Sequence, residues 1–215
     1  MTRLLAIVSL LLLPLGVWAQ EPASFVEGTQ YERLPEPVRT ADPTRIEVVE
    51  LFWYGCPHCF HFEPLLEKWS QALPKDVDFH RSPAMWNRPM AIHAQAFYAA
   101  QALGVLDKMH NPLFNALNVD HKHLETEDEL AELFAAHGVK EEDFRKAFNS
   151  FGVQASVKQA DARARSYRMT GTPEVVVNGK YRVSTRTAGN PEGMLKVMDF
   201  LIEKERAARA KQGGG

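Results

Sequence analysis

Hydrophobic positions along this chain recur with two different periods, and the first clear run predicts a strand. Residues 46–54 read IEVVELFWY, a run rich in β-branched and aromatic side chains on both faces. Such a run is typical of a strand buried on both sides in a parallel or mixed sheet. Gly55 ends the run, and Pro57 suits the first position of a helix whose apolar residues recur until Pro74. We therefore expect a strand-to-helix junction at residues 55–57.

A second strand is predicted at residues 77–81, and helical spacing then dominates from residue 86 to residue 151. Apolar residues recur every three or four positions in four stretches, which are 92–103, 106–117, 130–134 and 144–148. Gly104 and Gly138 occupy positions where C-terminal helix caps belong, and Thr126 with Glu129 forms a capping box. Four consecutive helices fit this part of the chain.

The last third of the chain returns to an α/β pattern. A long helix is predicted over residues 153–169, followed by two short strands at 174–177 and 180–183. The dipeptide Asn178-Gly179 separates these strands, and Asn-Gly between two such runs is the strongest short signal for a β-hairpin. Asn190-Pro191 opens a final helix, after which residues 211–215 form a polar tail that we expect to fray.

The N-terminus has the pattern of a secretory signal peptide. Arg3 precedes an apolar run over residues 4–15, which is too short to span a bilayer, and Val17 and Ala19 suit the two specificity positions of a cleavage site. We expect cleavage after Ala19, with an uncleaved anchor as the alternative. The mature protein is then exported to a compartment where disulfides persist.

Composition and charge narrow the choice of partner. The chain is 45% hydrophobic and 24% charged, which is typical of a globular protein. It carries 25 Lys and Arg against 27 Asp and Glu. This balance is too even to favour capture of nucleic acid, so we expect no nucleic-acid partner.

The two cysteines of the chain, Cys56 and Cys59, lie at the predicted strand-to-helix junction and enclose Pro57 and His58. A disulfide that closes so short a loop contributes only about 2 kcal/mol in the chain-entropy model, against about 4.7 kcal/mol for a 100-residue loop. Its purpose is therefore chemistry rather than stability. A thiol at a helix start faces unpaired N–H groups and the positive end of the dipole, both of which favour a thiolate. We expect Cys56 to be the reactive thiol and Cys59, one turn inside the helix, to be the more buried and less acidic partner.

His58 is a candidate for tuning this pair. An imidazole beside Cys56 would lower the pKa of that thiol, stabilise the reduced form and so make the disulfide more oxidising. The alternative is that His58 is an exposed turn residue with no role.

The same residues could also belong to two other kinds of site, a zinc site or a haem attachment site. Cys56, His58, Cys59 and His61 are four potential zinc ligands, but His58 lies inside a tight turn and no second ligand pair has zinc-finger spacing. Covalent haem attachment requires His directly after the second cysteine, where this chain has Phe60. No glycine-rich phosphate loop occurs, so we expect no cofactor other than the cysteine pair itself.

Four features together reveal a resemblance: the exported Cys56-Pro57-His58-Cys59 motif at a strand-to-helix junction, the Gly171-Thr172-Pro173 turn before a strand, the Asn-Gly hairpin and the helical insertion. The chain resembles the thioredoxin superfamily and, within it, the DsbA family of periplasmic thiol:disulfide oxidoreductases. The resemblance covers essentially all of the mature chain. It implies an α/β thioredoxin fold, a mixed central sheet flanked by helices, with an all-helical domain inserted between the second strand and the later strands. The expected parts are a signal peptide at 1–19, a first thioredoxin part at 20–84, the insertion at 85–151, a second thioredoxin part at 152–210 and a flexible tail at 211–215.

The resemblance also implies roles for three residues outside the cysteine motif. Pro173 would be cis beside the cysteines and would expose the backbone of Thr172 for strand-like pairing with an incoming peptide, the alternative being that Thr172-Pro173 is merely a turn. Glu50, a carboxylate within the apolar strand, would exchange a proton with Cys59, its pKa raised by burial. The matching position for the family's lysine carries Arg81, which cannot give up its proton and should hold Glu50 ionised. The alternative is that Glu50 only pairs structurally or reaches solvent.

The expected function is that of an exported oxidant, which donates its Cys56–Cys59 disulfide to newly exported proteins in the periplasm. The family implies reoxidation by an integral-membrane, quinone-linked protein of the DsbB type. A disulfide isomerase or reductase is the first alternative, although such isomerases usually carry a dimerisation domain for which few residues precede the first strand. The second alternative is a non-enzymatic exported chaperone or binding module.

Overall fold

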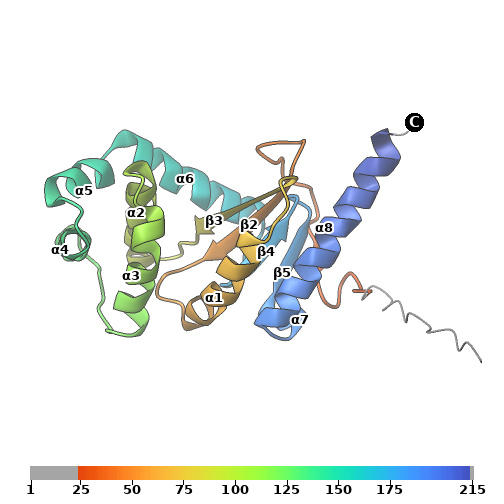
Figure 1. Ribbon diagram of the computed structural model, residues 1–215, viewed down its shortest axis with the longest axis horizontal. Coiled ribbons are helices and arrows are strands. Elements are labelled where there is room, and N and C mark those ends of the chain that lie inside the picture. Colours follow the sequence, from red (N-terminus) through yellow and green to blue (C-terminus); the bar gives the residue numbers. More distant parts are fainter. Residues whose placement is uncertain (1–23, 214–215) are drawn as a thin grey trace, which may run out of the picture.

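The computed structural model describes residues 24–213, so the predicted signal peptide lies outside the described residues. Its elements follow the order expected from the sequence, with two short additional elements, β1 and α7 (Figure 1). They are β1 (Glu32–Arg33), β2 (Ile46–Phe52), α1 (Pro57–Gln71), β3 (Val77–Pro83), α2 (Arg88–Ala102), α3 (Leu106–Asn118), α4 (Glu127–Ala136), α5 (Glu141–Phe148), α6 (Phe151–Ser166), β4 (Glu174–Val177), β5 (Tyr181–Ser184), α7 (Thr185–Ala188) and α8 (Pro191–Gly213).

A mixed five-stranded sheet forms the centre of the α/β part, with strand order β1-β5-β4-β2-β3. Strand β2 pairs with β3 in parallel and with β4 in antiparallel orientation, and all seven of its residues are buried. The prediction of a strand buried on both faces is therefore confirmed. The strand ends at Phe52, two residues earlier than the apolar run predicted.

Helices cover both faces of this sheet. Helices α1 and α8 share one hydrophobic cluster with β2, β4 and β5, to which Phe62, Leu66, Met194 and Met198 contribute. On the other face, Ala164 and Tyr167, at the C-terminal end of α6, pack against Val49, Leu51 and Val176. This arrangement is the thioredoxin fold that the sequence predicted.

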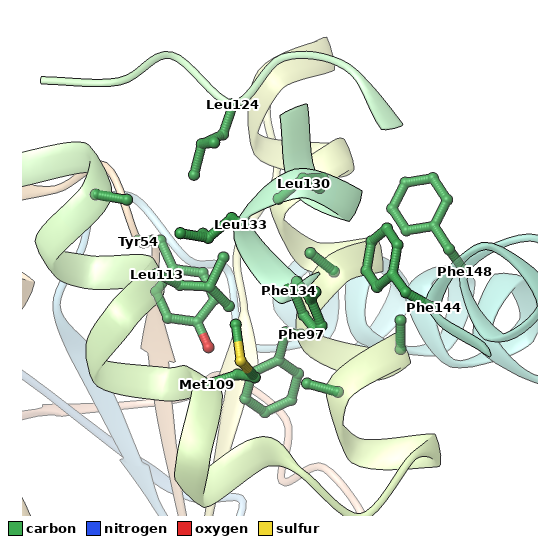
Figure 2. Packing of buried hydrophobic residues seen from close by; sticks show 14 of the residues in the cluster. Tyr54, Phe97, Met109, Leu113, Leu124, Leu130, Leu133, Phe134, Phe144 and Phe148 are labelled. Atoms are coloured by element: carbon green, nitrogen blue, oxygen red, sulfur yellow. The ribbon is translucent and has the colours of Figure 1, made fainter. Parts of the chain in front are cut away.

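The four predicted helices between β3 and α6 are present as α2–α5 and lie together at one end of the molecule (Figure 1). Thr126 and Glu129 form the predicted capping box at α4, and Gly104 and Gly138 adopt φ angles of 68° and 75° at the predicted helix ends. Figure 2 shows Tyr54, from the segment after β2, lying among side chains of α3. The cluster that fills the insertion also contains Cys56 and Cys59. The two cysteines are thus packed against the insertion.

The predicted hairpin joins β4 to β5. Asn178 and Gly179 have φ angles of 51° and 62°, which are the positive values that its two-residue turn requires. A Cβ at Gly179 would lie 2.0 Å from the carbonyl oxygen of Val38, and the Gly179 carbonyl accepts a hydrogen bond from the Val38 N–H. Only glycine fits this approach of the N-terminal segment to the hairpin.

Three features differ from the sequence prediction. Strand β1, which pairs with β5, and the one-turn helix α7 were not predicted, because elements of two and four residues are too short to show a period. Helix α8 continues to Gly213, so the first three residues of the expected tail at 211–215 are helical, and the flexibility of the tail stays a prediction. Helix α6 packs on the insertion through Val153 and on the sheet through Ala164, so we retain the domain boundary at 151/152 only as a proposal.

Candidate active site

Cys56 is placed at the start of α1 by a tight turn. It is the N-cap residue of the helix, its N–H donates to the carbonyl oxygen of Trp53 over 3.0 Å, and Pro57 follows at the first helical turn. The residue is buried, with 7% of its surface exposed, and both cysteines are free thiols. Its Sγ lies 3.4 Å from the carbonyl oxygen of Thr172.

The surroundings of Cys56 favour its thiolate. A hydrogen bond from the Cys59 thiol is the largest influence, and together with the Thr172 side chain and the backbone N–H groups of Cys59 and His58 it outweighs burial. These contacts lower the pKa of Cys56 from 9.0 to about 5. A thiol with this pKa is almost fully ionised at neutral pH.

Cys59 has the opposite character. It is completely buried, one turn inside α1, and burial raises the pKa of its thiol well above 9.0, with the nearby Cys56 sulfur adding to the effect. The two cysteines of one motif therefore differ strongly in acidity, in the direction predicted from the sequence.

His58 and Pro57 are exposed. The sequence predicted that the His58 imidazole acts on Cys56, whereas the contact with Cys56 in the structure comes from the backbone N–H of His58. The free N–H groups of the first helical turn thus stabilise the thiolate, as helix geometry dictates.

Thr172 and Pro173 reach Cys56 from a distant part of the chain, immediately before β4. The Thr172–Pro173 peptide bond is cis, as the resemblance implied. Thr172 is half-buried and Pro173 is buried. The pairing of β4 with β2 places this turn beside the helix start, because β2 leads directly to Cys56.

Glu50 lies in the middle of the central strand and is completely buried. It is paired in register with Arg81 on β3, whose Nε lies 3.3 Å from a Glu50 carboxylate oxygen. Burial raises the pKa of Glu50 from 4.5 to about 8, and the opposing attraction of Arg81 does not compensate for it. The expectation that Arg81 holds Glu50 ionised at neutral pH is therefore wrong, as is the alternative that Glu50 reaches solvent.

Helix α1 adds to the effect of burial, because its carboxylates bind the same guanidinium group. Arg81 Nη2 donates to Glu63 over 2.5 Å and to Glu67 over 3.1 Å. Among the described residues, neither Glu50 oxygen has a hydrogen-bond partner. Glu63 was not singled out from the sequence, although it follows Cys56 by seven residues on the same helix and could have been recognised by that spacing.

The buried polar cluster continues beyond Glu63. His110 of α3 has its Nε2 3.3 Å from Glu63 and its Nδ1 2.8 Å from the hydroxyl of Tyr54. Glu63, Arg81 and His110 also line a cleft of about 460 Å³ between α1, β3 and the insertion. The acid below the cysteines is thus part of a chain of polar side chains that reaches the protein surface.

No cluster of three or more His, Cys, Asp or Glu side chains suited to a metal ion occurs among residues 24–213. Within the same range, no helix has both the length and the apolar composition that crossing a bilayer requires.

Comparison with known proteins gives consistent matches over most of the chain. A family model described as a DSBA-like thioredoxin domain matches residues 75–192. The thiol:disulfide interchange protein DsbA of Azotobacter vinelandii is 46% identical over 200 residues, which are 92% of this chain and 94% of that protein. The corresponding protein of Pseudomonas aeruginosa is 44% identical and is matched over 98% of both chains. The crystal structure of Pseudomonas aeruginosa DsbA superposes with a TM-score of 0.84 at 45% identity, over 86% of this chain and 97% of that chain.

Proposed function

The chain belongs to the DsbA family of thiol:disulfide interchange proteins, and we propose that Cys56 and Cys59 are the pair through which it donates a disulfide to substrate proteins. It is a protein dithiol:disulfide oxidoreductase with a thioredoxin fold. The observation that carries the assignment is the contrast between the two thiols: the pKa of Cys56 is lowered to about 5, whereas that of Cys59 is raised by burial.

In the first step, a substrate thiolate attacks the Cys56 sulfur of the oxidised protein. A mixed disulfide forms, the Cys56–Cys59 bond breaks, and its electron pair leaves on Cys59. A buried Cys59 thiolate is costly, since the pKa of Cys59 is high. Glu50 is the proposed proton donor for this sulfur, because its pKa of about 8 leaves it mostly protonated at neutral pH. It is also near enough to Cys59 for its ionised form to raise the Cys59 pKa.

In the second step, another substrate thiolate attacks the substrate sulfur of the mixed disulfide. The substrate disulfide forms and Cys56 leaves as a thiolate. Its pKa of about 5 makes Cys56 a good leaving group, because a thiol of lower pKa leaves faster. Two electrons then reside on the reduced Cys56–Cys59 pair, and the direction of transfer favours oxidation of the substrate.

Substrate binding is proposed to use the backbone at Thr172. The Thr172 carbonyl oxygen lies 3.4 Å from Cys56 Sγ, and Thr172 as a residue is half-buried. An extended peptide that pairs with this backbone would bring its own cysteine sulfur to Cys56.

We propose that the protein works in the periplasm after removal of residues 1–19, since the apolar run at 4–15 has the form of a signal peptide. The reduced pair must be reoxidised for turnover, and an integral-membrane, quinone-linked protein of the DsbB type is the proposed oxidant.

The assay that tests the function uses a reduced, unfolded model protein with two native disulfides and the oxidised wild-type protein in stoichiometric excess. Wild type should form disulfides in the client, whereas Cys56→Ser and Cys59→Ser should not. Equilibration of the wild-type protein with glutathione buffers should show a pair that is reduced more readily than glutathione disulfide. A cysteine pair that stays oxidised in those buffers would indicate a reductase. If Cys56→Ser prevented aggregation of a client protein without cysteines as well as wild type does, the protein would instead be a chaperone.

A further inference from the structure

Trp53, three residues before Cys56, is held by a histidine of the helical insertion. Its indole Nε1–H donates to Nδ1 of His93 over 2.9 Å, and the two rings lie nearly parallel, with 14° between their planes. His93 belongs to α2 and is only 2% exposed. His93 lies outside every motif that the sequence pattern indicates.

The partners of His93 fix its charge and its tautomer. An indole N–H can only donate, so Nδ1 of His93 must be unprotonated. Nε2 then carries the proton and donates to the carbonyl oxygens of His123 and Leu124, each at 3.2 Å, in the loop between α3 and α4. A doubly protonated ring would direct an N–H at the indole N–H. Only neutral His93 in the Nε2–H form satisfies all of these contacts.

The loop that His93 binds has an irregular backbone. His121 and Leu124 adopt φ angles of 56° and 52°, in the left-handed region that residues other than glycine rarely occupy. The side chain of Leu124 packs into the core of the insertion (Figure 2). One imidazole thus joins three separate segments: α2, this loop and the end of β2.

Trp53 in turn determines the turn that leads to the cysteines. Its carbonyl oxygen accepts the Cys56 N–H, and its ring covers Gly55 so closely that a Cβ there would lie 2.4 Å from the ring. The side chain of Asn118, from α3, donates to the next carbonyl, that of Tyr54, over 2.7 Å. Two side chains of the insertion therefore hold two consecutive residues of the active-site turn.

We propose that His93 is a positioning residue for the Cys56–Cys59 turn, acting through the indole of Trp53, and that it does so only in its neutral form. The helical insertion then has a part in catalysis besides covering the site. Loss of the His93 acceptor frees the indole, loosens the turn over Gly55 and misaligns the N–H groups that stabilise the Cys56 thiolate.

The proposal has a defined pH dependence. Burial lowers the pKa of His93, and the carbonyls of His123 and Leu124 and the charges of Glu125 in the loop and Glu129 on α4 oppose this without cancelling it. The neutral form, and with it the Trp53 contact, is complete at neutral pH and is lost as the pH falls below the ordinary histidine range.

Two substitutions separate the two hydrogen-bonding functions of His93, which are acceptance from Trp53 at Nδ1 and donation to the loop at Nε2. In His93→Asn the amide oxygen takes the position of Nδ1 and can still accept from the indole, whereas in His93→Gln the amide nitrogen takes the position of Nε2 and can still donate to the loop. We expect His93→Asn to retain the thiolate pKa of Cys56, measured by absorbance at 240 nm, and His93→Gln to raise it. The rise is at most about one unit, because one neutral hydrogen bond carries no more than about a tenfold change in an equilibrium. Trp53→Phe, which removes the indole donor and keeps an aromatic ring, should give the same rise as His93→Gln.

A spectroscopic titration provides the readout that a purely structural role would not move. The tryptophan emission of the oxidised wild-type protein, in which Cys56 has no thiol to titrate, should change in one step as His93 is protonated at acid pH. Both His93 variants and Trp53→Phe should lack this step. Circular dichroism and denaturant midpoints verify that each variant is folded. The proposal is wrong if His93→Asn and His93→Gln raise the Cys56 pKa equally, or if neither His93→Gln nor Trp53→Phe raises it. It is also wrong if the emission step persists in both His93 variants.

Discussion

Reduction of the Cys56–Cys59 disulfide should stabilise the protein at pH 8 and destabilise it at pH 5. A disulfide ordinarily stabilises a fold through the unfolded chain, but here it closes a loop of four residues and contributes only about 2 kcal/mol. The reduced protein gains instead from the Cys56 thiolate. The pKa of Cys56 is about 5 in the folded protein against an ordinary value of 9.0, so the folded state favours the thiolate. This contribution is complete above the unfolded pKa and is lost as the pH falls through 5.

The magnitude follows from linkage between ionisation and folding. A shift from 9.0 to about 5 amounts to roughly 0.4 kcal/mol at pH 5, about 2.7 kcal/mol at pH 7 and about 4 kcal/mol at pH 8. Cys56 lies at the surface end of its helix, so we take about one third of this as lost to solvent screening. Against the cross-link of about 2 kcal/mol, the reduced and oxidised forms are then equally stable near pH 7. The reduced form is more stable by about 1 kcal/mol at pH 8, and the oxidised form by about 1.5 kcal/mol at pH 5.

Urea unfolding of both redox forms at pH 5, 6, 7 and 8 measures this difference. Glu50 is present in both forms, so its own titration cancels from the comparison to first order. Two variants that cannot form the disulfide serve as controls. Cys59→Ser keeps the Cys56 thiolate and a hydroxyl that can donate to it, so its stability should follow the pH dependence of reduced wild type. Cys56→Ser lacks the thiolate, and its stability should lack that dependence.

The reasoning is refuted if the difference between the two forms does not change between pH 5 and pH 8. It is also refuted if the oxidised form remains clearly more stable at pH 8, since the helix start would then stabilise the thiolate by less than the four-residue cross-link contributes. A pH dependence that persists unchanged in Cys56→Ser would assign the effect to another group.

Three further predictions concern single side chains. Limited alkylation of the reduced protein at pH 7 should label Cys56 before Cys59, and peptide mapping that shows the reverse order would exchange their roles. His58→Ala should raise the Cys56 pKa by less than about one unit, because the N–H groups of the first helical turn remain; a larger shift in the thiolate absorbance would show that the imidazole dominates. Glu50→Gln should slow the first exchange step, in which Cys59 leaves, more than the second, and equal slowing in stopped-flow assays with a cysteine peptide would remove Glu50 as the proton donor.

The elements that could be predicted from sequence are those whose signal lies within a few residues. The buried strand at 46–52, the four helices of the insertion and the Asn-Gly hairpin each follow from local period or turn chemistry. Strand β1 could not be predicted, because its two residues form a strand only through pairing with β5, about 150 residues away in the chain. The hydrogen bond between His93 and Trp53 joins positions 40 residues apart, so no local sequence pattern predicts it.

Which of the two cysteines is the more acidic was predictable for the same reason, since one begins a helix and the other lies one turn inside it. The contribution of Thr172 to the low pKa of Cys56 was not, because Thr172 lies 116 residues away in the chain. The ionisation of Glu50 was not predictable, because it depends on which carboxylates accept hydrogen bonds from the guanidinium group of Arg81.

Helix α1 changes the effect that Arg81 of β3 would have on Glu50 of β2 if the two residues formed an isolated pair. The register of β2 and β3 places its guanidinium beside Glu50, and an isolated pair of this kind would keep the carboxylate ionised. Helix α1, however, presents Glu63 and Glu67 on the turn that faces β3, and both take hydrogen bonds from the terminal nitrogen Nη2. Glu50 retains only a contact with Nε that lacks hydrogen-bond geometry. Glu50 and Glu63 are both buried, and the one cation that they share with the exposed Glu67 cannot offset the burial of both. Of the two, Glu50 has no exposed surface and no hydrogen bond, so it is the carboxyl that holds a proton. The same helix that makes Cys56 acidic therefore also keeps Glu50 protonated, so the leaving thiolate and the proton for its partner are both set by α1.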